Sequence, residues 1–255
     1  MNEEELCKKR LLDLSGQADR RGIALFSDFL NLNEQNIYHQ IRQLFATRTE
    51  CFGGVSYAER QMIAFIPDAL SLWGDTEITF PITALRAVPA SPRFAETLGH
   101  RDILGALMNL GIDRGRIGDI IVGDGEYFIL CERGIAEFVT DQLRQIRHTA
   151  VRLEACAADE IRSVQTITEC DGIITSVRLD AVIACICHLS RSQAAALITK
   201  EKVFVGGKLM HNPSAACHPQ DIISVRGYGR FVFLKEYGET KKGRIRFVYG
   251  VYGRE

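Results

Sequence analysis

The residues of this chain with the clearest chemistry are the arginines and lysines of its last third. From Ser176 to Glu255 the sequence holds thirteen Lys and Arg and six Asp and Glu, a balance of +7. The preceding 175 residues hold eighteen Lys and Arg and twenty-six Asp and Glu, a balance of −8, so the total of −1 hides a bipolar chain. Guanidinium and ammonium groups gathered in this way bind phosphate oxygens. The charge distribution therefore predicts a polyanion-binding module joined to an acidic body.

Two short helices are predicted at the start of this basic part. Residues 178–189 carry apolar side chains at helical spacing, which leaves Arg178 facing solvent or phosphate. Ser190-Arg191-Ser192-Gln193 matches a capping box, so that a second helix starts at Arg191. Small and polar residues beside Arg191 and Lys200 would let a sugar–phosphate backbone come close, and a helix start favours anions.

A hairpin and further strands are predicted after the second helix. Residues 202–205 and 208–210 flank Gly206-Gly207, a pair that supplies the positive φ angles of a tight hairpin turn. Residues 221–226 and 231–235 read as two more strands, with a glycine-rich turn between them.

The preceding residues are predicted to form two regions. Residues 1–60 read as an N-terminal helical segment, and a strand at Gln61–Ile66 then opens a middle domain over 61–165. The later part of that domain follows the order strand, helix, strand, strand, helix, strand, at 78–88, 101–110, 119–122, 127–131, 135–146 and 151–155. This βαββαβ order is typical of ferredoxin-like and RRM-like domains, so the fold class is α+β. A polar stretch over 166–176, with a turn at Asp171-Gly172, is expected to separate it from the basic module.

The middle domain has two candidate ways to contact RNA. An RRM stacks bases on aromatic residues of its sheet, and Tyr127 and Phe128 stand in the third predicted strand. Adjacent strand residues face opposite ways, so at most one of the two can stack. The better candidates flank the first helix of the domain. They are His100, Arg101, Arg114 and Arg116.

Composition argues against several other classes of protein. No apolar run approaches the roughly 20 residues that span a bilayer, and residues 1–10 are charged, so we expect a cytoplasmic monomer without membrane contact. The eight cysteines form no CxxC pair. The nearest approach to a metal site, around Cys185 and Cys187, places side chains that diverge on a helix. We therefore expect reduced thiols, no metal and no cofactor.

The ordered motifs of the last third resemble the alpha-L RNA-binding domain first known from ribosomal protein S-four. The matching stretches are Arg178-Leu179-Asp180, Leu189-Ser190-Arg191-Ser192, Ile198, Lys200, Val203–Val205, Lys208 and Asp221–Val225. Together with GHRDILGALMNLGIDRGRIGDI at 99–120, they make nearly the whole chain similar to the YlmH family. Members of that family place an RRM-like domain before a C-terminal alpha-L domain, which we expect here at 176–255.

The resemblance implies a function and a set of contacts. It implies binding to the rRNA of the large ribosomal subunit carrying stalled peptidyl-tRNA, in ribosome-associated quality control that supports C-terminal tailing of the nascent chain. In related alpha-L domains the start of the second helix and the following basic residues meet structured RNA. By position this carries over to Arg178, Arg191, Ser192, Gln193, Lys200, Lys202 and Lys208. Arg226 and Arg230 are added for their charge alone.

Two other functions stay open beside a non-catalytic RNA-binding protein. Arg178-Leu179-Asp180 matches the catalytic Arg-Leu-Asp of pseudouridine synthases, in which the Asp is the nucleophile. The Thr and Gly that follow it in those enzymes are absent here, and we expect Asp180 to cap a helix or form a salt bridge instead. The family also carries a gene-neighbourhood link to cell division, which allows a protein–protein adaptor.

Overall fold

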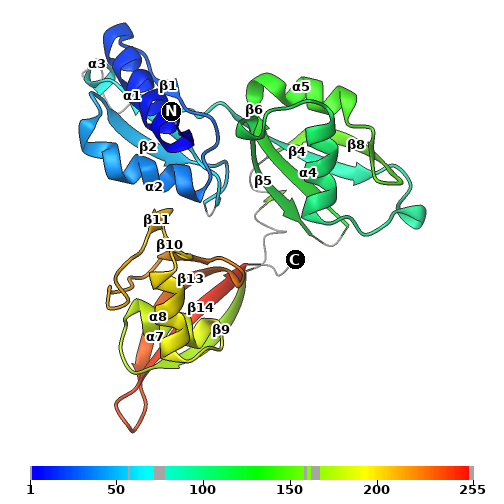
Figure 1. The fold of residues 1–255 in the computed structure, drawn as a ribbon. Helices are drawn as coiled ribbons and strands as arrows, with labels where there is room; N and C mark the ends of the chain where they lie inside the picture. The colour runs from blue at the N-terminus through cyan, green and yellow to red at the C-terminus, as the bar shows by residue number, and fades with distance from the viewer. Residues whose placement is uncertain are drawn as a thin grey trace. The chain divides into compact units, whose positions relative to one another are not determined.

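The computed structural model describes residues 2–56, 58–71, 78–123, 125–157, 160–161 and 167–252. They form two compact units, unit 1 over Met1–Gln165 and unit 2 over Thr166–Arg254 (Figure 1). Helices and strands occur in both units, which confirms the α+β class. Residues 162–165, at the expected end of the middle domain, and 253–255, at the end of the chain, lie outside the described residues.

The N-terminal segment contains a sheet as well as helices. Its elements are α1 (Glu3–Arg21), β1 (Leu25–Phe26), α2 (Leu32–Ile41), η1 (Arg42–Leu44), β2 (Arg48–Phe52), β3 (Met62–Ile66) and α3 (Asp68–Ser71). The strands pair antiparallel in the order β1-β3-β2. The expected helices are present, but the segment also contains strands at residues 25–26 and 48–52, and β3 belongs to this sheet rather than to the middle domain. Every residue of β3 is buried, as suits the central strand of a covered sheet.

The rest of unit 1 has the predicted RRM-like topology. Its elements are β4 (Ile82–Pro89), η2 (Pro92–Phe94), α4 (His100–Asn109), η3 (Arg114–Arg116), β5 (Ile117–Val122), β6 (Tyr127–Glu132), α5 (Arg133–Gln142), β7 (Gln145–Ile146) and β8 (Thr149–Cys156). The sheet order is β5-β6-β4-β8-β7, with every neighbouring pair antiparallel. Apolar residues of α4 and α5 pack on one face of this sheet, which confirms the βαββαβ prediction.

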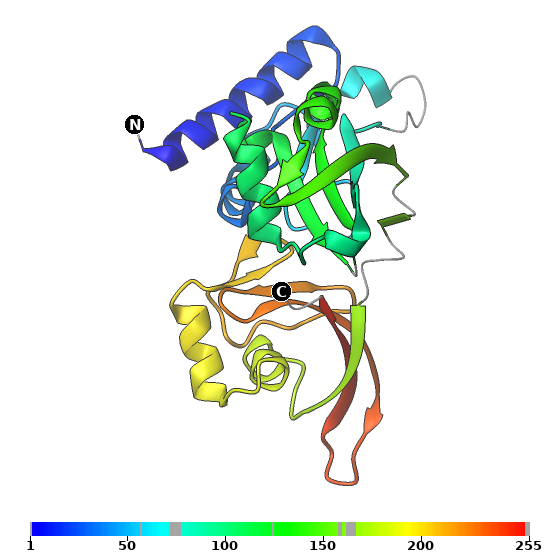
Figure 2. The same cartoon turned by 90° about the vertical axis from the view of Figure 1, so that its right-hand side faces the viewer.

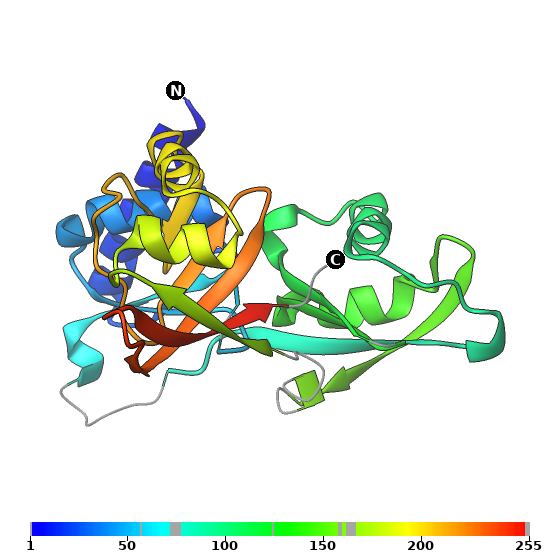
Figure 3. The same cartoon turned by 90° about the horizontal axis from the view of Figure 1, so that it is seen from below.

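Unit 2 is a six-stranded sheet with two helices on one face. Its elements are β9 (Ile167–Ile174), α7 (Leu179–Ile186), α8 (Arg191–Thr199), β10 (Val203–Val205), β11 (Lys208–Leu209), β12 (Ile222–Val225), β13 (Gly229–Glu239) and β14 (Ile245–Tyr252). The strand order is β11-β10-β12-β13-β14-β9. Figures 2 and 3 show α7 and α8 on the same side of these strands. Their core joins apolar residues of both helices to alternate residues of the sheet, among them Phe233 and Phe247.

Local signals in unit 2 were read correctly from the sequence. Ser190 Oγ accepts the N–H of Gln193, and Gln193 Oε1 accepts the N–H of Ser190, which closes the predicted capping box. Gly206 and Gly207 have φ angles of 54° and 77°, and they join β10 to β11 in the predicted hairpin.

The stretch expected to be a linker is a strand. β9 pairs with β14 from Ile167–Tyr252 to Ile174–Ile245, so no turn forms at Asp171-Gly172. Gly172 serves packing instead, because a Cβ at this position would lie 2.2 Å from Cε1 of Phe247. The glycine leaves room for an aromatic ring of the core, a role that the local sequence does not distinguish from a turn.

Among the described residues, no single helix is long and apolar enough to cross a membrane. The pair α7 and α8 reaches that length and composition only when taken together, across a bend of 113°.

We predict that Gly172→Ala destabilises unit 2 by about 1–3 kcal/mol, because the added methyl group displaces the ring of Phe247 from a filled core. Amide hydrogen exchange of β9 and β14 measures the effect. The control is Gly105→Ala in α4, where a Cβ would meet no atom within 4 Å; helix propensity there favours alanine by up to about 1 kcal/mol. Unchanged exchange in the Gly172 variant would contradict this packing role.

Candidate nucleic-acid interface

Arg178 and Arg191 meet on one buried carboxylate. The side chain of Asp180, in the first turn of α7, is only 8% exposed. Its Oδ1 accepts a hydrogen bond from Arg178 Nε at 3.2 Å, and its Oδ2 accepts bonds from Arg178 Nη2 at 3.2 Å and from Arg191 Nη2 at 2.7 Å. Arg178 is the N-cap of α7 and Arg191 is the first residue of α8. The carboxylate therefore ties the starts of the two helices together, and the expected salt-bridge role of Asp180 is confirmed.

The ionisation of Asp180 depends on the two arginines. Burial is the largest influence on its pKa and opposes ionisation, but the hydrogen bonds and charges of Arg191 and Arg178 together lower the pKa below its ordinary value. The arginine side chains remain 43% and 49% exposed. Each guanidinium has five N–H donors, so both keep donors for a ligand. Arg178 thus faces solvent, as expected from the sequence. It is also held beside Arg191 by Asp180, and the charges of the three side chains sum to +1.

One side of α8 continues this surface. Ala194 and Ile198 are buried against the core. The exposed residues of the helix recur at intervals of three and four, and so lie on one face. They are Ser192, Gln193, Ala196, Thr199 and Lys200, together with Arg191 at the edge. Small side chains at the centre of this face and cations at its two ends leave a surface that a nucleic-acid backbone can approach closely.

Two further lysines that were predicted to bind RNA lie near this side of unit 2. Lys202 lies three residues after the end of α8, and its N–H donates to the carbonyl of Leu197. Lys208 stands opposite Val205 in the ladder of β10 and β11. Since Val205 packs toward the helices, Lys208 lies on the helix side of the sheet. We name the set Arg178, Arg191, Ser192, Gln193, Lys200, Lys202 and Lys208 the helix-side surface.

Arg226 and Arg230 lie on the other face of the sheet. The Arg226 guanidinium is 5.1 Å from the ring centroid of Phe204, and that of Arg230 is 4.5 Å from the ring centroid of Tyr252. Phe204 alternates with residues that pack under the helices, and so points away from them. Arg226 and Arg230, which the sequence analysis added for their charge alone, therefore do not belong to the helix-side surface, because charge does not reveal which face of a strand a residue occupies.

The sheet of the middle domain is closed to base stacking. Tyr127 is 3% exposed within the core under α4 and α5, where its hydroxyl accepts the N–H of Leu98 at 3.1 Å. Phe128 is 1% exposed and packs against Val55 and Ala58 of the preceding segment. The stacking hypothesis is therefore wrong for both residues.

The four candidates of the second RNA surface lie at the two ends of α4, His100 and Arg101 at its start and Arg114 and Arg116 beyond its end. Arg114 Nη1 donates to the carbonyls of Ile117 and Gly118, and burial lowers the pKa of Arg114 to about 10, with the neighbouring Arg60 adding to this. Arg116 forms an ion pair with Glu132. His100 begins α4, beside the exposed Arg101. Arg114 thus stabilises the loop before β5 through its hydrogen bonds, and Arg116 stabilises the surface of unit 1 through its ion pair.

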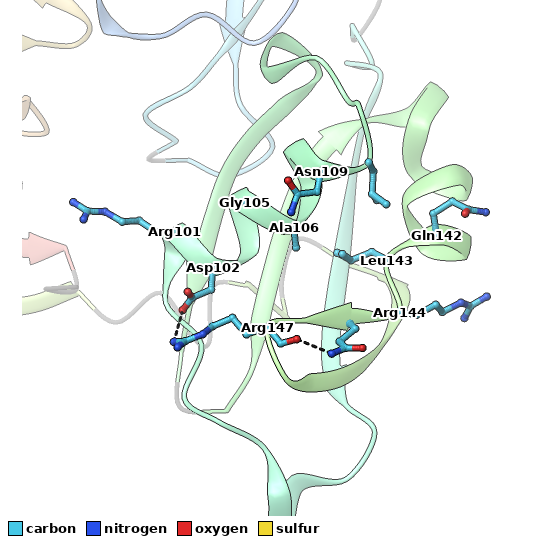
Figure 4. Close-up of a pocket in the computed structure, with 11 residues that line it drawn as sticks. Arg101, Asp102, Gly105, Ala106, Asn109, Gln142, Leu143, Arg144 and Arg147 are labelled. Carbon is cyan, nitrogen blue, oxygen red and sulfur yellow. Dashed lines mark hydrogen bonds and ion pairs between the residues drawn. The ribbon is translucent and has the colours of Figure 1, made fainter.

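Arg101 lines a groove with two arginines that sequence reasoning missed. The groove has a volume of about 620 Å³, and Arg144 and Arg147, which follow α5, also line it (Figure 4). Arg147 is paired with Glu96 and with Asp102, each at 3.7 Å. Figure 4 shows Arg101 and Arg144 pointing outward in different directions. The groove therefore has less cationic character than its arginine content suggests.

No group of three His, Cys, Asp or Glu side chains within the described ranges is placed to hold a metal ion. Burial raises the pKa of both Cys187 and Cys217 to about 12, so these thiols stay protonated at neutral pH.

The chain is similar to known proteins over most of its length. Residues 76–160 match a family model described as "Putative RNA-binding domain in YlmH". Over 224 residues the chain is 30% identical to "Ribosome-associated protein quality control protein P2" of Bacillus subtilis (strain 168), a match that covers 88% of this chain and 85% of the relative. A solved structure, "Cell division protein ylmH from Streptococcus pneumoniae", matches with a TM-score of 0.50 at 23% identity. That match covers 63% of this chain and 94% of the other, and at this identity it shows the fold alone.

We predict that Asp180→Asn destabilises unit 2 by about 1.5–3 kcal/mol at pH 7, because the amide lacks the negative charge with which Arg178 and Arg191 form ion pairs. The folded pKa of Asp180 is depressed, so its contribution is present above about pH 4, the ordinary range of a carboxyl group, and is lost as the pH falls through the folded value. Amide hydrogen exchange of α7 and α8 at pH 7, and acid unfolding followed by circular dichroism, measure this difference.

The control for that experiment is Asp141→Asn, since Asp141 is exposed and lies 4.0 Å from Arg144. Its effect is expected to stay within about 0.5 kcal/mol. An Asp180 variant as stable as the wild type at pH 7 would show that the two arginines do not need the carboxylate.

Proposed function

The chain belongs to the YlmH family, and from this premise we propose that it is a non-catalytic protein that binds the rRNA of the large ribosomal subunit, together with peptidyl-tRNA, in quality control of stalled nascent chains. The RNA-binding family model and the name of the Bacillus relative support a ribosome-associated, RNA-binding role in the cytoplasm. The large subunit, the peptidyl-tRNA and the helix-side surface are the finer parts of the proposal.

The observation that supports the proposal best is the pair of guanidinium groups, Arg178 at the start of α7 and Arg191 at the start of α8. Asp180 holds Arg178 and Arg191 side by side, so less side-chain freedom is lost when a phosphate binds. The capping box satisfies the N–H groups of Ser190 and Gln193. The N–H groups of Arg191 and Ser192 lie in the first turn of α8, where a helix provides no backbone acceptor for them, so they are available to bind an anion.

The helix-side surface fits RNA backbone better than base edges. Its charged residues present N–H donors without acceptors, and donors of this kind bind phosphate oxygens. The surface is a helix face with small residues rather than an aromatic platform, which suits recognition of folded RNA by shape. Binding is therefore expected to weaken steeply as salt rises.

The alternative of a pseudouridine synthase is disfavoured by the state of Asp180. A nucleophilic carboxylate has to reach its substrate, whereas both oxygens of Asp180 accept hydrogen bonds from arginines and the side chain is 8% exposed. The adaptor alternative is tested by partners: a protein that acts by binding other proteins keeps them after RNase treatment, whereas the proposed function predicts that RNase releases this protein from its complexes.

The first test removes three lysines of the helix-side surface that do not bond to Asp180. We predict that Lys200→Gln/Lys202→Gln/Lys208→Gln weakens binding to purified large subunits and lowers the slope of log affinity against log salt by about 2 to 3, because each lost phosphate contact lowers it by roughly 0.7–0.9. Cosedimentation over a salt series measures both effects.

The matched control removes three exposed cations of α1, as Lys9→Gln/Arg20→Gln/Arg21→Gln. The net charge then changes by the same amount in the two variants. A difference in their affinity for large subunits therefore shows that the lysines of the helix-side surface contact RNA directly. If both variants lose the same affinity, attraction is general and the helix-side surface is wrongly assigned.

A second test separates binding from folding at one residue. Ser192 is the second residue of α8, where a carboxylate is favoured by the helix dipole by about 0.3–1 kcal/mol. We predict that Ser192→Glu leaves α8 as stable as in the wild type or more so, while its charge repels phosphate and weakens binding to large subunits roughly tenfold or more. Ser192→Ala is the neutral control. Full binding by the Glu variant would exclude RNA from the start of α8.

A further inference from the structure

Five cations of unit 2 take no part in the surfaces described above. They are Lys235, Lys241, Lys242, Arg244 and Arg246, on the outer part of the β13–β14 hairpin. Figures 1 and 2 show this hairpin projecting past the rest of unit 2. We name residues 235–246 the distal hairpin. The run Lys-Lys-Gly-Arg-Ile-Arg at 241–246 is visible in the sequence, but only the structure shows that it lies at the end of a projecting hairpin.

The tip of the distal hairpin is an ordered turn. The N–H of Gly243 donates to the carbonyl of Thr240, and the N–H of Thr240 donates to the carbonyl of Arg244. Thr240 Oγ1 accepts the N–H of Arg244, and Gly243 has a φ of 68° that favours glycine. These bonds hold Lys241, Lys242 and Arg244 in one compact arrangement, which reduces the entropy lost when they bind a ligand.

The three cations of the tip are not neutralised. Lys241, Lys242 and Arg244 form no ion pair with any residue in the described part of the chain, and all three are exposed. The nearest acidic residues along the strand, Glu236 and Glu239, stand opposite Phe247 and Ile245, which places them on the helix side of the sheet. The tip therefore presents its charge to solvent.

A tyrosine is exposed on the face away from the helices, next to this charge. The pairing of β13 with β14 shifts twice, between Phe233 and Lys235 and between Glu236 and Gly238, so that Tyr237 is the unpaired residue of the second bulge. Bulges re-aim side chains in this way. Tyr237 is 47% exposed, and its hydroxyl interacts with Asp171 and Arg246, whose partners in the sheet place them on the same face. These interactions place the hydroxyl of Tyr237 beside Arg246.

We propose that the distal hairpin is a second RNA-binding surface, in which Lys241, Lys242 and Arg244 bind backbone phosphates and the ring of Tyr237 stacks on an unpaired base. The inference rests on the proposed function and adds a site to it. Cations beside an exposed aromatic ring are the combination that binds single-stranded nucleic acid, because phosphates and base faces are satisfied together.

The distal hairpin and the helix-side surface take different segments of RNA. Tyr237 and Arg246 lie on the sheet face away from the helices, while the start of α8 lies on the helix side. Because the sheet separates the two surfaces, one short RNA segment cannot contact both. Unit 2 is therefore bivalent: structured RNA lies along α8, and a loop or a single-stranded stretch lies against the hairpin.

The first experiment uses the full chain with Lys241→Gln/Lys242→Gln/Arg244→Gln, which keeps Thr240 and Gly243 and so keeps the turn. Binding to purified large ribosomal subunits is measured over a salt series beside the wild type and the α1 control variant. We expect the slope of log affinity against log salt to fall by about 2 to 3 in the tip variant and to stay at the wild-type value in the control. An unchanged slope in the tip variant, with the wild type bound, overturns the hairpin site alone.

If the wild type itself does not bind large subunits, the proposed function fails and the hairpin site fails with it. A combined variant carries the substitutions of the hairpin tip and of the helix-side lysines. If its loss of binding free energy equals the sum of the losses in the two separate variants, the two surfaces make independent contacts. If the combined variant loses no more than the helix-side variant alone, the second contact is overturned.

The second experiment identifies the partner of Tyr237 by ultraviolet crosslinking on the large subunit, followed by mass spectrometry of the joined peptides. A nucleotide attached to the peptide that contains Tyr237 supports the site, and a crosslink to a ribosomal protein there overturns it. Tyr237→Leu is expected to weaken binding about 5- to 150-fold, the range of one base stacked on an aromatic ring. Tyr237→Phe keeps the ring and is expected to stay within about twofold, and equal losses in the two variants would exclude stacking.

Discussion

The buried carboxylate of Asp180 is the constraint on which the basic surface of unit 2 depends. A charge at 8% exposure is tolerated only when opposite charges and hydrogen bonds reach it, and Arg178 and Arg191 supply both. The two arginines come from the starts of different helices, so one ion cluster fixes the approach of α7 to α8. The same contact limits where their guanidinium groups can point. The same cluster therefore fixes the helix packing and orients the guanidinium groups that we propose bind phosphate. Mutation of Asp180 changes both at once.

The middle domain shows why a fold does not decide a function. Its β5-β6-β4-β8 order is that of an RRM-like domain, yet the sheet face on which such domains stack bases is packed against Val55, Ala58 and Ile161. Arg86, on β4, lies near Glu126, Glu154 and Glu160, an acidic surrounding that disfavours phosphate. RNA binding by this domain therefore has to use another side. The charge of the α4 groove is largely balanced within the protein, which leaves unit 2 as the stronger candidate for backbone contacts.

What the sequence predicted correctly depends on neighbours in the chain, and what it missed depends on distant contacts. The capping box at Ser190 and the Gly206-Gly207 turn are decided within four residues, and both form. Gly172 has the composition of a turn, but its role is set by Phe247, far away in the sequence. The burial of Phe128 is likewise decided by the segment around Val55. Salt bridging by Asp180 was expected from the helix start, while its partner Arg191, eleven residues later, required the structure.

A count of charges locates a module without locating its binding faces. The basic balance of the last third indicated a polyanion-binding module, but in a sheet with helices on one side each strand residue is assigned to a face by alternation and by bulges. Arg226 and Arg230 fall on the face away from α7 and α8, and the bulge at Tyr237 exposes a ring on that same face. Because the core beneath the helices is continuous, cations on the two sides of the sheet cannot merge into one site. If both faces bind RNA, as we propose, the positive charge of unit 2 is divided between two separate contacts with a large polyanion.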